Sequence, residues 1–491
     1  MKTVDANGYY FPTDFRYPIS YTTKTYKHED VTVHLKIPPA TPDLVAALAE
    51  HLKKNREKHL SRMPIERIVA VLDKASRLWL DKDYPYRRLA LQTIPVITGF
   101  SSEAVEASID VEMETSLEHD MWQALRSEIQ NPLYLDDFQY SDELDGYRRA
   151  FGPELVVSFF SENIPSLPHL LFMRSALVKA ACLGKVASGE PTFAALYLKT
   201  IEDIDPDMAG CMAVLYWQGG DEEVERAAFN HADAAVIFGS VETCASILKR
   251  IPNTVKALVH GHKMGFGVIG KNRMNHKDAE DLAVGVAYDH AMFDQQACLA
   301  PQVYYLEEGG EISPGEFARI LADAMSSMEE KMPRGRLSAG EAALIHQSRG
   351  RYEIKELSGE AVQLMTSVYG TAWTIVCEKS PGRFSPSPLN RFVRLWRVKD
   401  ISQVIRELKP VGPFLQNAAV AVGDEREPDF LRALGKLGVA RITSPGNMPV
   451  PSMMWHHDGI ATLAALLRWC DVEKMMKSEY RTRNYECRVN A

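Results

Sequence analysis

The chain has 491 residues and a formal net charge of −9. A chain of this length is too long to fold around one compact core, so two or three domains are expected. A small scaffold held together by disulfides is excluded. Because Lys and Arg are scattered among acidic residues, neither a nucleic acid nor an anionic membrane surface is expected as the main partner.

The sequence begins MKTVDANGYYFPTDFRYP, without the basic and apolar segments of a signal peptide, and no run of about eighteen uninterrupted apolar residues occurs. We therefore expect a cytoplasmic protein without a membrane span. The seven cysteines are widely spaced and form no Cys-x-x-Cys pair, so reduced thiols are expected rather than a disulfide framework or a zinc site. They are Cys182, Cys211, Cys244, Cys298, Cys377, Cys470 and Cys487.

The first third of the chain changes from a strand pattern to a helical one. Residues 8–37 are rich in Tyr, Thr, Val and Phe between prolines, which predicts short strands forming an N-terminal arm over residues 1–40. From 42 to about 130 the apolar residues recur at helical spacing, and Pro85 and Pro95 are expected to interrupt the helices.

After Gly152 short apolar runs alternate with helical patterns, which is typical of parallel strands buried on both faces. The runs are 155–160, 175–185, 212–217, 234–239 and 257–261. A second set is expected as helices 277–292, 315–330 and 401–408 with strands 303–307, 371–378 and 391–398. The fold class is therefore predicted as α/β.

The predicted domains are a helical layer with a nucleotide-binding domain over 41–262, a catalytic domain over 263–440, and a C-terminal segment over 441–491. Within that segment, residues 444–459 are too rich in Pro and Gly for a regular element. We expect this loop to return over the active-site cleft.

Cys298 lies where a helix end meets a Pro-bounded strand, in AMFDQQACLAPQ. Such a junction can expose a thiol to a cleft and direct backbone N–H groups toward it, which favours the thiolate. Taken alone, this cysteine is more simply interpreted as a buried core thiol.

Three other segments are weak signals for binding or catalysis. In AAVIFGSVET a strand runs through Gly239 and Ser240 into a helix, where a helix N-terminus can receive a phosphate. In KVASGEP, Lys185 leaves a predicted strand and could contact a ribose or a phosphate, although a solvated lysine is the favoured interpretation of the segment taken alone. In SENIPSLP, Asn163 follows a buried strand, where its amide could donate to an oxyanion or simply belong to a turn.

The terminal loop contains His456, His457 and Asp458 in sequence. Adjacent side chains on an irregular segment do not supply converging ligands, so no metal site is expected. His457 could act as a general acid or orienting group, or could pack in a domain cleft.

Taken in order, NIP (163–165), KVAS (185–188), IFGSVET (237–243) and QAC (296–298) resemble the aldehyde dehydrogenase superfamily from about residue 150 onward. The FDQQACLAPQ and SPG…HHDG stretches resemble its LuxC family, the acyl thioester reductases. This resemblance implies a Rossmann-type nucleotide-binding domain, an α/β catalytic domain and a strand arm used in a homo-oligomer.

The resemblance also implies residue roles. Cys298 matches the nucleophile, and its backbone N–H and the Asn163 amide match the oxyanion hole. Lys185 matches the residue that touches the adenosine ribose. The residues matched to the remaining cofactor contacts are Ser188, Gly239, Ser240 and Thr243.

Two departures from the family pattern bear on the reaction. Ser188 stands where NAD-preferring relatives carry an acid that repels a 2′-phosphate, so NADPH is permitted, NADH remains possible, and nearby Glu190 leaves the preference open. Hydrolytic relatives carry a Glu-Leu-Gly-Gly-type motif whose Glu activates water, but VHGHKMGFGVIGK (259–271) contains no acid. An acyl-Cys298 would then persist until it meets hydride or a thiol.

The sequence therefore predicts NAD(P)H-dependent reduction of a medium- or long-chain acyl thioester to an aldehyde, with His457 as candidate proton donor. The acyl donor would be acyl-CoA, an acyl carrier or an acyl-activating partner enzyme. Two alternatives remain: a dehydrogenase that oxidises aldehyde to acid, and a nucleotide-independent cysteine acyltransferase or thioesterase.

Overall fold

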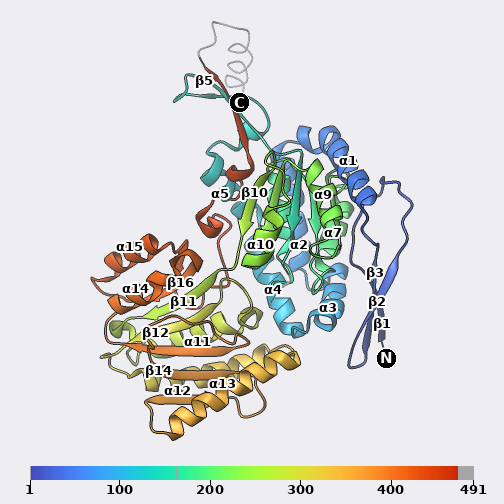
Figure 1. Ribbon diagram of the computed structural model, residues 1–491. Coiled ribbons are helices and arrows are strands. Elements are labelled where there is room, and N and C mark those ends of the chain that lie inside the picture. The colour runs from blue at the N-terminus through green and yellow to red at the C-terminus, as the bar shows by residue number, and fades with distance from the viewer. Residues whose placement is uncertain (1, 162, 474–491) are drawn as a thin grey trace.

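The computed structural model describes residues 2–161 and 163–473 (Figure 1). The chain starts with a three-stranded sheet in the order β1-β3-β2, formed by β1 (Lys2–Asn7), β2 (Thr22–His28) and β3 (Val31–Ile37). Its buried residues Val33 and Leu35 pack with Val96 of the helical layer. The predicted strands are present, and the first begins at Lys2. Their use in an oligomer stays a prediction.

Five helices follow as a layer beside the first large sheet (Figure 1). They are α1 (Pro42–Lys58), α2 (Ile65–Leu80), α3 (Pro85–Thr98), α4 (Ser102–Glu114) and α5 (Glu118–Ile129). Pro85 is the first residue of α3, a position where the N–H that proline lacks would have no helical partner. The prediction that Pro95 interrupts a helix is wrong. Pro95 lies inside the last turn of α3, and the helix ends only at Gly99, which has a φ of 89°.

The first large sheet contains five parallel strands in the order β10-β9-β6-β7-β8. The strands are β6 (Leu155–Phe159), β7 (Ala181–Lys185), β8 (Met212–Leu215), β9 (Ala234–Phe238) and β10 (Lys256–His260). The helices between them are α6 (Pro168–Leu177), α7 (Phe193–Ile204), α8 (Pro206–Ala209), α9 (Glu222–His231) and α10 (Val241–Leu248). The strand order reverses between β6 and β9, and ligands bind beyond the carboxyl ends of strands at such a point. The expected strand over 175–185 begins only at Ala181, because its first residues complete α6.

The second large sheet contains seven strands in the order β13-β14-β15-β12-β11-β16-β17. They are β11 (Met264–Ile269), β12 (Pro301–Glu307), β13 (Val362–Thr366), β14 (Thr374–Lys379), β15 (Phe392–Val398), β16 (Leu415–Ala421) and β17 (Arg441–Thr443). Only β13 is antiparallel to its neighbour within this sheet, which the structure describes in full.

Helices cover both faces of the seven-stranded sheet. They are α11 (Ala279–Ala291), α12 (Pro314–Lys331), α13 (Ala339–Leu357), α14 (Ser402–Leu408) and α15 (Glu427–Leu437). One face packs against α11 and α12 and the other against α14 and α15. Burial on both faces explains the near-continuous apolar runs of the central strands. The α/β class predicted from the sequence is confirmed.

A small antiparallel sheet joins distant parts of the chain and projects at the top of Figure 1. Its order is β18-β5-β4, with β4 (Gln139–Ser141), β5 (Gly146–Phe151) and β18 (Arg468–Glu473). The C-terminal segment therefore returns to the first half of the chain. Residues 474–491 of the predicted 441–491 segment, and with them Cys487, lie outside the described residues. Within residues 2–161 and 163–473, no helix has the length and apolarity that crossing a membrane requires.

Candidate active site

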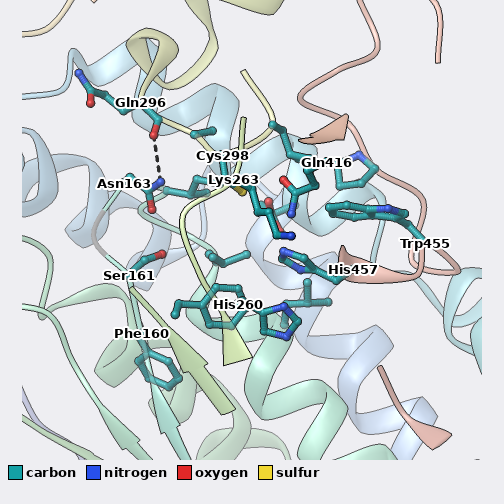
Figure 2. A pocket seen from close by; sticks show the side chains of 18 of the residues that line it. Phe160, Ser161, Asn163, His260, Lys263, Gln296, Cys298, Gln416, Trp455 and His457 are labelled. Carbon is teal, nitrogen blue, oxygen red and sulfur yellow. Dashed lines mark hydrogen bonds between the residues drawn. The ribbon is translucent and has the colours of Figure 1, made fainter. Parts of the chain in front are cut away.

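A cavity of about 450 Å³ lies at the reversal point of the five-stranded sheet, facing the seven-stranded sheet. Five of the predicted site residues line it: Asn163, Gly239, Ser240, Cys298 and His457. Figure 2 shows Asn163, Cys298 and His457 around one space, together with His260 and Gln416. The chain thus brings together segments that follow β6 and β9, the segment before β12, and the C-terminal loop.

The segment that leads to Cys298 has an unusual backbone. Phe293, Asp294 and Gln295 have φ angles of 54°, 48° and 64°. Non-glycine residues in this left-handed region cost about 1–3 kcal/mol each and persist only where surrounding contacts fix them. This segment is therefore held in place by its neighbours rather than by its own backbone preferences.

A second left-handed run, at residues 389–391, supplies those contacts. The Asn390 N–H donates to the Asp294 carbonyl at 3.1 Å, and the Phe392 N–H donates to Gln295 Oε1 at 3.0 Å. The fully buried Arg391 donates from Nε to Asp294 Oδ1 at 2.9 Å. These contacts hold the two left-handed runs together, and they therefore fix the backbone that leads to Cys298.

Backbone packing holds the other side of Cys298. The Asn417 amide donates to the Leu299 carbonyl at 3.1 Å. The backbone of β11 comes so close that a Cβ on Gly265 would meet the Leu299 carbonyl oxygen at 2.7 Å. Only glycine permits this close approach of β11 to the residue that follows the cysteine.

The half-buried Cys298 thiol is protonated at neutral pH in this structure. Burial, with the charge of Asp458 next, raises the pKa of Cys298 to about 12. The backbone N–H groups of Cys298 and Leu299 and the Gln416 side chain act in the opposite direction. These donors would stabilise a negative sulfur or oxygen, but formation of the thiolate requires a base in the cavity.

Asn163 lies opposite the cysteine segment. Its Nδ2 donates to the Gln296 carbonyl at 3.0 Å, two residues before Cys298 (Figure 2). A side-chain amide has two N–H groups, so one donor remains beyond this contact. Its position suits the predicted oxyanion contact.

The residues assigned to a cofactor divide into two groups. Gly239 and Ser240 line the cavity at the start of α10, where Ser240 Oγ accepts from the Thr243 N–H at 3.1 Å. A Cβ on Gly239 would meet Thr243 Cγ2 at 3.1 Å, so glycine permits the tight strand-to-helix turn. Thr243 therefore shapes this turn and does not line the cavity.

The second group contains Lys185, the last residue of β7, and Ser188, and it lies outside the cavity lining. The Lys185 ammonium lies 5.8 Å from the centre of the Tyr216 ring, and Ser188 is exposed. Nearby Glu190 is buried, and its Oε1 accepts from the Phe193 N–H at 3.0 Å, at the start of α7. Its carboxylate therefore caps a helix and does not face outward beside Ser188.

Sequence reasoning missed a hydrogen-bonded pair in the cavity wall. His260, the last residue of β10, pairs through Nδ1 with Asp458 Oδ2 at 2.7 Å, and Gln416 Nε2 donates to Asp458 Oδ1 at 2.6 Å. This fixes the His260 ring and leaves its Nε2 for proton transfer. Its place at a strand's carboxyl end was a signal in the sequence, but its partner is 198 residues away.

His457 lies in a column of four rings. It stacks on Trp455 with ring centroids 4.6 Å apart and lies tilted against His260 with centroids 4.3 Å apart, and His260 stacks on Phe238. Burial, with the charge of His260 next, holds the pKa of His457 well below its usual range. The role of His457 as proton donor stays a prediction.

His260, His457 and Asp458 could offer ligand atoms within 4.8 Å of one another. Both carboxylate oxygens of Asp458, however, already accept hydrogen bonds from His260 and Gln416. The absence of a metal site stays a prediction. The sequence also gave no indication of Arg174 and Glu112, two buried charged residues that line the same cavity.

The fold is that of the aldehyde dehydrogenases. An NADP-dependent glyceraldehyde-3-phosphate dehydrogenase from Bacillus halodurans C-125, solved with NADP, matches with a TM-score of 0.68 at 14% identity, covering 92% of this chain and 95% of that one. An NAD-dependent benzaldehyde dehydrogenase from Corynebacterium glutamicum matches with a TM-score of 0.66 at 13% identity, covering 95% and 96%. At such identities the likeness concerns the fold.

Within this type, residues 60–469 match the family described as acyl-CoA reductase (LuxC), and the chain belongs to that family. A long-chain acyl-protein thioester reductase from Photorhabdus luminescens is 24% identical over 424 residues, covering 84% of this chain and 83% of the relative. Another from Aliivibrio fischeri is 25% identical over 431 residues, covering 84% and 82%. The resemblance seen in the sequence is confirmed.

Proposed function

We propose that this protein reduces a medium- or long-chain acyl thioester to the aldehyde with NADPH, through a covalent acyl-Cys298. The observation that carries the proposal is the position of Cys298, in a cavity that also contains Asn163 and the N-terminus of α10. Among the described residues that line this cavity, Glu112 is the only carboxylate. No acid from the β10–β11 stretch lies there to activate water against the acyl-cysteine.

The cofactor residues fit a dinucleotide. Gly239 and Ser240 place the first turn of α10 at the cavity, where N–H groups without helical partners suit a pyrophosphate. The exposed Ser188, with the Glu190 carboxylate turned away, leaves room for a 2′-phosphate and supports NADPH, while NADH remains usable. When bound, the reduced nicotinamide supplies a hydride.

In the acylation step, His260 Nε2 takes the proton of Cys298 while Asp458 stabilises the resulting imidazolium. The thiolate attacks the thioester carbonyl, and the oxyanion is held by the Cys298 N–H and the free N–H of Asn163. The carbon–sulfur bond to the carrier breaks, and His260 returns the proton to the departing thiolate. The acyl group is then bonded to Cys298.

In the reduction step, hydride addition to the acyl carbon gives a thiohemiacetal oxyanion on Cys298, which the same donors hold. Collapse of this species breaks the carbon–sulfur bond, releases the aldehyde and regenerates the Cys298 thiolate, which takes one proton from solvent. The names of the relatives, acyl-protein thioester reductases, support a carrier protein or acyl-activating partner as donor besides CoA. Assembly as a homo-oligomer belongs to the same proposal.

The test is incubation of the purified protein with acyl-CoA and NADPH while absorbance loss, trapped aldehyde and protein mass are followed. Cys298→Ala should abolish both the acyl adduct and turnover. Cys470→Ala, at a partly exposed cysteine on β18, is the matched control and should retain both. Release of the acyl label as free acid without NADPH oxidation would show an acyltransferase or thioesterase instead.

A further inference from the structure

Arg174, on α6, is a buried arginine in the wall of the reaction cavity. Its side chain is only 7% exposed, and its Nε has no hydrogen-bond partner. No residue within 2–161 or 163–473 forms a hydrogen bond or ion pair with its guanidinium. The fully buried Arg391, by contrast, pairs with Asp294 and Glu329. A buried charge without a partner is costly, which points to a ligand that supplies one.

Two carboxylates, Glu128 and Glu112, act on Arg174 through their charge, but neither forms an ion pair with it. Glu128 is engaged elsewhere, since its two oxygens accept from the backbone N–H groups of Thr462, Leu463 and Ala464. Glu112 forms no ion pair with Arg174, although the Arg174 charge lowers the pKa of Glu112 against the stronger effect of burial. The positive charge at Arg174 therefore remains available to the cavity.

Arg174 lies at one end of an apolar wall that begins beside Cys298. Leu167, Leu170 and Arg174 all line the cavity and are spaced so that they share one face of α6. Ile164 and Ala297, one residue before Cys298, belong to one apolar cluster, and Leu167 packs against that cluster. The seven helical steps from Leu167 to Arg174 span about 10 Å along the helix axis.

We propose that the acyl group reduced at this site carries a carboxylate at its far end, bound by Arg174. This inference rests on the proposed reductase function and narrows its substrate class to thioesters of dicarboxylic acids. The methylene chain would lie along Leu167 and Leu170, and the guanidinium fork would hold the terminal carboxylate through two parallel hydrogen bonds. A terminal methyl group there would leave Arg174 buried and unpaired.

The experiment compares ω-carboxyacyl-CoA with straight-chain acyl-CoA of equal carbon number, over a range of lengths, in the wild type and in Arg174→Met. We expect the wild type to prefer the ω-carboxyacyl substrate by about ten- to a hundredfold in kcat/KM. Arg174→Met should lose this preference, so that the ratio of its kcat/KM values for the two substrates approaches one. Arg319→Met, at an exposed arginine of α12, should behave as the wild type.

A second measurement does not depend on turnover. A free dicarboxylate should raise the melting temperature of Cys298→Ala but not that of Cys298→Ala combined with Arg174→Met, and Arg174→Lys should keep part of the effect. Equal use of both substrates by the wild type, with the ratio unchanged in Arg174→Met, overturns the inference and leaves the reductase function standing. If neither thioester is reduced, the reductase function fails, and the melting shift alone decides whether Arg174 binds a carboxylate.

Discussion

Replacing Glu112 by Gln should remove a pH-dependent loss of stability. Burial raises the pKa of Glu112 from 4.5 to about 7, so the native protein keeps a proton that the unfolded chain releases within this window. Because the native state binds more protons, the free energy of unfolding falls as pH rises through it. At 1.36 kcal/mol per pKa unit, the full loss is about 3 kcal/mol.

The assay is a series of thermal melts from about pH 5 to about pH 8 for the wild type and Glu112→Gln. The melting temperature of the wild type should fall more steeply with rising pH, by several degrees across the range. Glu114→Gln, at an exposed acid on the same helix, is the control and should follow the wild type. Parallel profiles for the wild type and Glu112→Gln would refute the reasoning, because a carboxylate that ionises freely in the fold carries no such loss.

Three further changes test the site. Asp294→Asn should cost about 1.5–3 kcal/mol, because it takes from the buried Arg391 one of its two charge partners and leaves only Glu329. Calorimetry measures the loss of stability, and iodoacetamide labelling of Cys298 checks that the cysteine segment moves. Ser188→Glu should lower kcat/KM for NADPH by about tenfold or more relative to NADH, since a carboxylate repels a 2′-phosphate; unchanged cofactor ratios would contradict this. Asp458→Asn should slow reduction by about 10²–10⁴-fold yet speed alkylation of Cys298, because the charge of Asp458 raises the pKa of that thiol; slower alkylation would contradict it.

Much of the fold could be predicted because buried parallel strands are short apolar runs bounded by turns. The runs at 155–160 and 234–239 correspond to β6 and β9, which flank the crevice. The expected break at Pro95 failed because a proline near a helix end loses a single hydrogen bond and the packed helix tolerates it. Local rules predict elements well and their ends less well.

The candidate site could be predicted only in part. The contact between Asn163 and Gln296 spans 133 residues, and only the resemblance to a known family brought these segments together. No sequence motif contains both His260 and Asp458, so the hydrogen bond between them could not be predicted. Arg174 lies in the last turn of α6, where a basic residue normally faces water beside the helix C-terminus. Its burial follows from the packing of α4 and the C-terminal segment around it, which no local pattern records.

The four hydrogen bonds that residues 462–464 donate to Glu128 set the order in which the active site can form. The loop with His457 and Asp458 is held from behind by this one carboxylate on α5. During synthesis, both large sheets can fold while the cavity still lacks a wall and His260 lacks its partner. The cavity wall can therefore be completed only after residues 457–464 are made, which follow every strand of the two large sheets in the chain.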